Sequence, residues 1–247
     1  VLWEALRQEL VERSEGVYAF VHDRIHEAAY SLTPQALRAQ AHFRIGRLLA
    51  LNTTPERLEE RIFEIVGQLN RGISLIDLEE ERAQLARFSL VAGLRAKTAT
   101  AYASALTYLS TGMELLEGAD PLQYHDLQFS LTLNRAECEL LTGHLAVADE
   151  RLTGLATLAL DTVERGRVAC LHMDVCLLMD RSDHAVTACL AYLRHVDIDW
   201  SPHPDDAAVR VEYEQIWTLL GDRSIGALID LPLMTDAASL IKTKGFP

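Results

Sequence analysis

The stretch "AECELLTGHLAVADERL", residues 136–152, carries the clearest structural pattern in the sequence. Ala136 precedes Gly143, and Ala148 and Leu152 follow it at the spacing of a tetratricopeptide-type helix pair. Glycine permits the tight turn between two helices because it has no Cβ atom. A small residue in the second helix lets the first helix pack close to it. We therefore predict two helices that turn at Gly143.

The same pattern recurs further along the chain. In "VCLLMDRSDHAVTACLAYL", residues 175–193, Asp180 takes the place of the turn residue and Ala185 that of the small residue. Ala185 follows Ala148 by 37 residues, which is close to the ~34-residue period of this repeat class. The sequence thus predicts an all-α fold, a tetratricopeptide-like helical-repeat superhelix.

Two further copies and three helix starts extend this layout. A degenerate copy covers residues 95–116, and a fourth pair is expected to start at Asp205 and end near Leu231. Apolar side chains recur at helical spacing within residues 209–220 and predict an amphipathic helix there. A capping residue before proline is typical of a helix start. Such starts are predicted at Thr33-Pro34, Thr54-Pro55 and Asp120-Pro121.

The first thirty residues have a different pattern. "LWEALRQELV", residues 2–11, has helical spacing, whereas "VYAFV", residues 17–21, alternates like a strand, with Gly16 at the turn. Helix, hairpin and helix in this order are typical of the C-terminal part of a winged-helix module. We divide the chain into a winged-helix remnant (1–30), connecting helices (31–80), tetratricopeptide-like repeats (81–236) and a truncated or altered tail (237–247).

Composition excludes several classes of function. The 247 residues are 49% hydrophobic and 24% charged, which is ample for a buried core. The formal net charge is −13 and no block is rich in Lys or Arg, so we expect no nucleic-acid partner. No apolar run approaches the ~20 residues of a spanning helix, so we expect no membrane insertion. The four cysteines form no C-x-x-C pair, and we expect reduced core residues in a cytoplasmic protein.

Two groups of histidines are candidates for a metal site. In "VHDRIHEAAY", residues 21–30, His22 and His26 are four apart and could share a helix face. Tyr30 stands where the zinc motif H-E-x-x-H has its second histidine, so we expect a half-buried, hydrogen-bonded helix face instead of a metal site. His195 precedes and His203 lies within the loop "DIDWSPHP", residues 197–204, which we interpret as a connector between repeats.

Motifs of nucleotide binding and covalent catalysis are missing from the sequence. Neither G-x-x-x-x-G-K-[ST] nor G-x-G-x-x-G occurs, and G-x-S-x-G is absent as well. We therefore predict no catalytic, cofactor-binding or metal-binding residue in this segment and do not interpret it as an enzyme. Trp200 and Trp217 are the residues we would place in a groove for a small ligand.

Several blocks together resemble one family of proteins. They are "YAFVHDRIHEAAYSLTPQALRAQAHFRIGRLLA" (18–50), "IFEIVGQLNRG" (62–72), "AKTATAYASALTYLSTGMELL" (96–116) and "YEQIWTLLGDRSIGALIDLPLMTD" (213–236). They resemble the repeat region of large bacterial multidomain signalling proteins. Those proteins carry a STAND-class, AAA-type ATPase module, often after a serine/threonine-kinase-like domain and before GAF and histidine-kinase domains. The resemblance spans roughly residues 5–236.

The resemblance implies a regulatory role. The segment would be a non-catalytic sensor and protein-interaction module, with ATP and Mg²⁺ bound by an ATPase module upstream. Its partners would be that ATPase domain and either another protein or a small-molecule inducer. The family pattern would make a domain junction of His22, Asp23, Arg24, His26 and Glu27. The alternative is the inducer-binding repeat domain of a STAND-type transcription regulator of the maltose-activator type.

Overall fold

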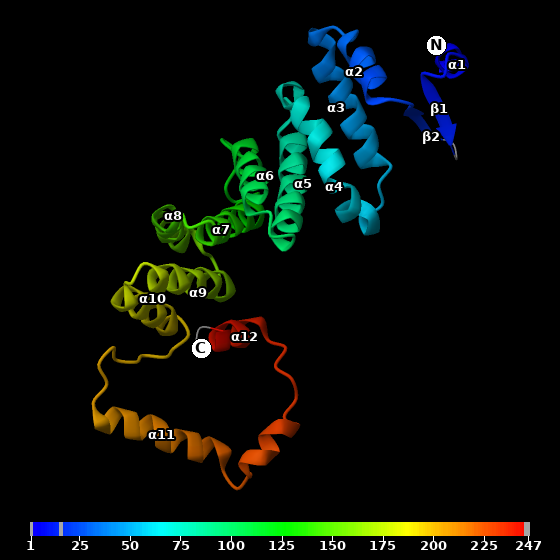
Figure 1. Ribbon diagram of the computed structural model, residues 1–247. Helices are drawn as coiled ribbons and strands as arrows, with labels where there is room; N and C mark the ends of the chain where they lie inside the picture. The colour runs from blue at the N-terminus through cyan, green and yellow to red at the C-terminus, as the bar shows by residue number, and fades with distance from the viewer. Residues whose placement is uncertain (1, 15–16, 245–247) are drawn as a thin grey trace. The chain divides into compact units, whose positions relative to one another are not determined.

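The chain is all-α apart from one short hairpin, as the ribbon of the computed structural model shows (Figure 1). The structure describes residues 2–14 and 17–244. The predicted all-α class is confirmed. The chain divides into two compact units, residues 1–88 and 89–247.

The first unit begins with a helix and a hairpin. Helix α1 (Leu2–Arg7) leads into strands β1 (Val11–Ser14) and β2 (Val17–Phe20), which pair antiparallel with Val11 opposite Phe20. The predicted hairpin is therefore confirmed, while Gly16 lies outside the described residues. The helices that follow are α2 (Asp23–Ser31), α3 (Gln35–Leu51), α4 (Pro55–Arg71) and the 3-10 helix η1 (Ile73–Leu75). Helix α5 (Glu79–Thr98) crosses the division between the units, which falls after residue 88.

Helices α3 and α4 pack closely in this unit because one side of the contact is a glycine. A Cβ added at Gly46 of α3 would lie 2.6 Å from Leu69 Cδ2 of α4, so a larger residue would push the helices apart. Ile62, Ile65 and Val66 of α4 are fully buried. Burying such an apolar stripe stabilises the pair by roughly 1.5–3 kcal/mol per side chain.

The second unit consists of consecutive helices that pack on their neighbours. Its elements are α6 (Tyr102–Leu115), α7 (His125–Leu141), α8 (Leu145–Leu158), α9 (Thr162–Leu178), α10 (Ser182–Arg194), α11 (Asp206–Leu220), the 3-10 helix η2 (Ile225–Asp230) and α12 (Ala237–Lys244). Each of α6 to α9 contacts the next helix, α7 also contacts α9, and α12 contacts α9. Contact between alternate helices is what a stacked array of helix pairs requires.

Two helix pairs form as their sequences predict. Gly143, between α7 and α8, has a φ of 80°, the left-handed region that glycine adopts without strain. Asp180, between α9 and α10, has a φ of 58°. Ala148 is fully buried against α7 and Ala185 is 5% exposed. The core of these pairs is formed by Phe129, Leu133, Ala136, Ala148, Leu152, Leu155, Ala159, Val168 and Val175.

Of the three predicted helix starts, one is confirmed, one is displaced by one residue and one is wrong. Thr54 is the N-cap of α4 with Pro55 first in the helix, as expected. Helix α3, however, begins at Gln35 with Pro34 as its N-cap, so Thr33 does not cap it. After Asp120-Pro121 the chain makes a turn, because Asp120 Oδ1 accepts a hydrogen bond from the amide of Leu122 at 3.0 Å, and α7 begins only at His125.

The predicted fourth helix pair is also wrong. Helix α11 begins at Asp206, and the carboxylate of Asp205 caps it by accepting from the amide of Ala208 at 2.7 Å. Its partner, however, is replaced by the short 3-10 helix η2, and α11 buries none of its residues. Its apolar stripe is exposed, with Ile216 at 59%. The pattern predicted the helix correctly but not its packing.

Candidate functional site

The five predicted junction residues lie at the start of α2. His22 is the N-cap of the helix, and Asp23, Arg24, His26 and Glu27 follow within it. All five side chains are exposed, so the half-buried face expected for His22 and His26 is wrong. The His26 ring packs on Phe20 of β2, with 5.2 Å between ring centroids. The role of these residues at a domain junction stays a prediction.

A chain of polar contacts centred on the buried His42 was not predicted. The hydroxyl of Tyr30 on α2 lies 3.1 Å from His42 Nε2 on α3, and His42 Nδ1 lies 2.7 Å from Gln68 Oε1 on α4. Because the amide oxygen only accepts, Nδ1 donates to it and Nε2 accepts from Tyr30. His42 is 8% exposed, so its two bonds hold three helices together. A hollow of 610 Å³ beside this chain is lined in part by His26 and Arg38.

The two tryptophans proposed for a groove are surface residues. Trp200 lies in the loop after α10 and is 40% exposed, and Trp217 on α11 is 47% exposed. Trp217 packs edge-on against Tyr213, with 6.0 Å between ring centroids. Neither tryptophan lines the hollow beside His42, the groove between α7, α9 and α10, or the hollow along α9 and α10. Their role in ligand binding stays a prediction.

A larger groove lies between α7, α9 and α10. It has a volume of 710 Å³, and most of its lining is apolar. The side chains that α7 and α9 contribute include Leu133, Leu140, Leu141, Cys170, Leu171, Met173 and Leu177. From α10 come Ser182, Ala185, Val186 and Cys189. Charged groups enter it at Glu137, Arg167 and Asp174. An apolar floor with a few charges fits an amphipathic segment.

One segment of the chain already lies against this groove. Ile241 of α12 is part of the lining, and α12 packs on α9. Gly166 makes the approach possible, since a Cβ there would lie 2.8 Å from Ile241 Cγ1 and 2.9 Å from Tyr192 Cζ. The groove therefore accepts an apolar side chain from a short helix.

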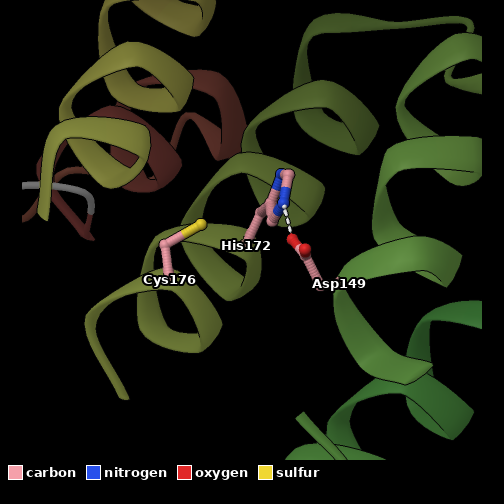
Figure 2. A group of neighbouring side chains, drawn as sticks. All are labelled: Asp149, His172 and Cys176. Atoms are coloured by element: carbon pink, nitrogen blue, oxygen red, sulfur yellow. Dashed lines mark hydrogen bonds and ion pairs between the residues drawn. The ribbon is translucent and has the colours of Figure 1, made fainter. Parts of the chain in front are cut away.

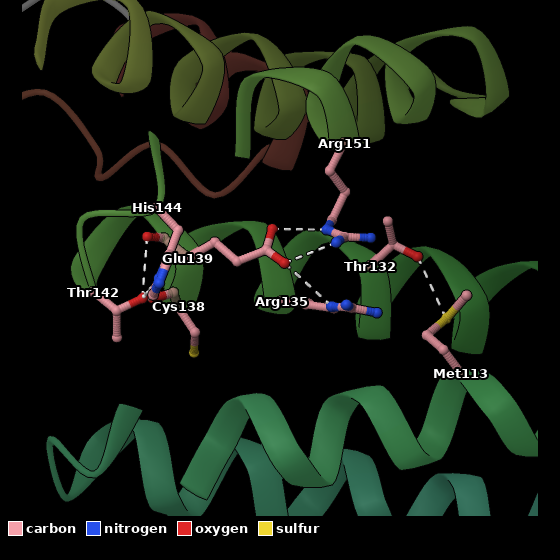
Figure 3. A network of polar contacts seen from close by, with 8 residues as sticks. All are labelled: Met113, Thr132, Arg135, Cys138, Glu139, Thr142, His144 and Arg151. Carbon is pink, nitrogen blue, oxygen red and sulfur yellow. Dashed lines mark hydrogen bonds and ion pairs between the residues drawn. The ribbon is translucent and has the colours of Figure 1, made fainter. Parts of the chain in front are cut away.

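An ion-pair network joins α7 to α8 beside the groove (Figure 3). Arg151 donates to both carboxylate oxygens of Glu139 at 2.7 Å, and Arg135 donates to Oε1 at 3.2 Å. Glu139 is 5% exposed, so this carboxylate depends on its partners. Burial also raises the pKa of the neighbouring Cys138 thiol to about 11. The network thus ties α7 to α8 through the buried carboxylate of Glu139.

A second cluster joins α8 to α9 (Figure 2). Asp149 Oδ1 of α8 lies 2.7 Å from His172 Nε2 of α9, and Asp149 Oδ2 lies 3.3 Å from Arg181 Nη1. Cys176, four residues after His172, is buried, and one ligand atom from each of Asp149, His172 and Cys176 lies within 4.8 Å of the others. Burial is the main cause that raises the pKa of the Cys176 thiol, and the Asp149 charge adds to it. Carboxylate, imidazole and thiol are all metal ligands.

A comparable group joins the start of α7 to the start of α9. His125 Nε2 is 2.9 Å from Glu164 Oε1, with Asp126 nearby. Glu164 Oε2 also accepts from the amide of Leu160 at 2.7 Å, and the Glu164 amide donates to Asp161 Oδ1. The carboxylate of Glu164 is therefore engaged in ordering the start of α9.

The stacked helix pairs make this chain an all-α protein whose fold is consistent with a helical repeat. It is similar to the hybrid signal transduction histidine kinase G of Dictyostelium discoideum, with 24% identity over 237 residues. That alignment covers 86% of this chain and 7% of the length of the kinase. No family model and no solved structure matches the chain. Among the described helices, none combines the length and apolar character that crossing a membrane requires.

Proposed function

We propose that this segment is a non-catalytic regulatory and protein-interaction module of a signal-transduction protein. The observation that carries the proposal is the 710 Å³ apolar groove between α7, α9 and α10, against which Ile241 of a short helix lies. The similarity to a signal transduction histidine kinase supports a signalling context. The natural occupant is an amphipathic helix that places apolar side chains into the groove and charges along its rim.

The context of the whole protein belongs to the same proposal. The sequence blocks that resemble the bacterial ATPase–repeat proteins suggest that a STAND-type ATPase module, which would bind ATP and Mg²⁺, precedes the repeats in a cytoplasmic kinase. The groove would then present its occupant, or lose it, according to the state of that module. A repeat array suits this role because it offers a binding surface without catalytic groups.

Site-specific photocrosslinking tests the groove. A benzophenone amino acid replaces Leu141 or Leu177, which line the groove and are 47% and 56% exposed, so the exchange spares the core. The matched control is Leu158, which is 62% exposed on α8 and outside the groove. Crosslinking is performed in cells that make the natural protein, and crosslinked peptides are identified by mass spectrometry.

The proposal expects both groove positions to crosslink to one amphipathic segment of another domain or protein. Leu177→Glu, combined with the probe at Leu141, should reduce that product at least tenfold, because a charge would enter an apolar contact. Crosslinks no stronger than those from Leu158 would refute an occupied groove. Crosslinks to residues 206–220 would show that α11 of the same chain closes the groove, which also contradicts the proposal.

A second candidate function rests on a different hollow. A space of 540 Å³ lies along α9 and α10, with Ala156 of α8 at its edge. Arg165 and His195 line it, with 3.4 Å between Nη1 and Nε2, and the other charged or imidazole side chains of the lining are His172, His184 and the acidic Asp183. This is a suitable lining for a small organic anion, as an inducer-binding domain of a transcription regulator would need. A rise in melting temperature with a metabolite, abolished by Arg165→Ala, would favour this function over the groove.

A further inference from the structure

We propose that Asp149, His172 and Cys176 form a binding site for a zinc-class divalent metal ion that joins α8 to α9. None of the three side chains lines the groove between α7, α9 and α10, so the site stands or falls independently of the groove, whereas His172 also lines the 540 Å³ hollow along α9 and α10.

The positions of the three side chains follow from the repeat. His172 and Cys176 are four residues apart on α9, so they lie on the same face of that helix. Asp149 comes from α8, which packs against α9. Figure 2 shows His172 and Asp149 directed toward one another, with Cys176 one turn further along α9. Two consecutive helices therefore bring the three candidate ligands together at one site.

The distances are within reach of a bound ion. Zinc holds nitrogen and oxygen ligands at ~2.0–2.1 Å and sulfur at ~2.3 Å, so tetrahedral ligand atoms lie roughly 3.3–3.6 Å apart. The three ligand atoms here lie within 4.8 Å of one another, and Asp149 Oδ1 and His172 Nε2 are at 2.7 Å. Shifts of about an ångström, which side-chain rotation supplies, bring them to that geometry.

The donor set selects among metals. One sulfur, one nitrogen and one oxygen suit Zn²⁺ and similar transition ions, whereas Ca²⁺ and Mg²⁺ prefer oxygen alone. Three protein ligands leave a fourth position for water. The ion can enter from solvent, because the side chains of His172 and Asp149 are 20% and 26% exposed. The thiol proton of Cys176 leaves when the metal binds.

Arg181 fits the same arrangement. Its guanidinium lies 3.3 Å from Asp149 Oδ2, which leaves Oδ1 for the metal. Carboxylates that bind metals are themselves held by hydrogen bonds of this kind. Without a metal, the same contacts form an ion-pair cluster across α8, α9 and the start of α10. An experiment must therefore distinguish a metal site from a metal-free ion-pair cluster.

Cobalt spectroscopy of the reduced, metal-free chain separates the two. Titration with Co²⁺ should give one bound ion per chain, with a thiolate-to-cobalt band in the near ultraviolet and tetrahedral bands in the visible. Zn²⁺ should displace it. Cys176→Ser should abolish the thiolate band, whereas the control variants Cys170→Ser and Cys189→Ser, at two half-buried thiols, should keep it.

Asp149→Asn supplies a variant that preserves shape and removes the charge. It should weaken Zn²⁺ binding at least tenfold in competition with a chelating dye, with an unchanged circular dichroism spectrum. The absence of a thiolate band in the wild-type chain would overturn the metal site, as would a band that survives Cys176→Ser. Equal Zn²⁺ affinities of the wild type and Asp149→Asn would also overturn it.

Discussion

Glu139 offers the sharpest test of how α7 and α8 are held together. Its carboxylate is 5% exposed and accepts two hydrogen bonds from Arg151 and one from Arg135 (Figure 3). Glu139→Ala leaves two guanidinium groups close together without a counter-charge. Breaking a buried pair costs about 3–5 kcal/mol. The two arginine side chains are 30% and 22% exposed and can turn to water, so we expect a loss of about 2–3 kcal/mol.

Urea unfolding followed by circular dichroism measures this loss. The matched control is Arg135→Ala, which removes one bond of a pair four residues apart on the same helix and should cost only about 0.5 kcal/mol. Hydrogen exchange in Glu139→Ala should quicken in the peptides of α7 and α8. A loss below about 1 kcal/mol in Glu139→Ala, or an equal loss in Arg135→Ala, would refute the reasoning.

Three further expectations concern glycines, a histidine and a thiol. Gly143→Ala should destabilise the chain by about 1 kcal/mol, because residue 143 has a φ of 80°. Gly154→Ala should stabilise the chain by about 0.5–1 kcal/mol, because Gly154 lies on the exposed side of α8, away from the helix ends. Urea unfolding midpoints measure both changes. His42→Phe should cost about 1–2 kcal/mol, since it leaves Gln68 without its partner, and thermal unfolding measures this. Cys138, with a pKa of about 11, should react with iodoacetamide at pH 8 roughly a hundredfold more slowly than an exposed thiol; equal rates by mass spectrometry would contradict its burial.

The helix pairs could be predicted because their cause is local. Gly143 and Asp180 are turn residues that tolerate positive φ, and a small residue at Ala148 fixes how closely two helices approach. The helix start at Asp120 failed for an equally local reason. An aspartate side chain can bond to nearby backbone groups in a turn as well as cap a helix, and Asp120 closes a turn with Leu122 where a helix was predicted.

Packing beyond the pair was less predictable. The apolar stripe of α11 is real, yet the helix buries nothing, because periodicity marks an apolar face without saying what covers it. The His42 chain between Tyr30 and Gln68 was missed for a related reason. Its members lie on three helices, and no spacing in the sequence relates them.

The contact between Asp149 and His172 follows from the geometry of the repeat. Successive helical residues are rotated by about 100°, so when Ala148 faces the core, Asp149 is turned toward the next helix, where it contacts His172. The equivalent residue of the next pair is Val186, which follows Ala185. It is 45% exposed and lines the apolar groove, as does Ile241 of α12. The same position of the repeat is thus polar where it contacts the next helix and apolar where it lines the groove, which is why the groove is the surface we expect a partner helix to occupy.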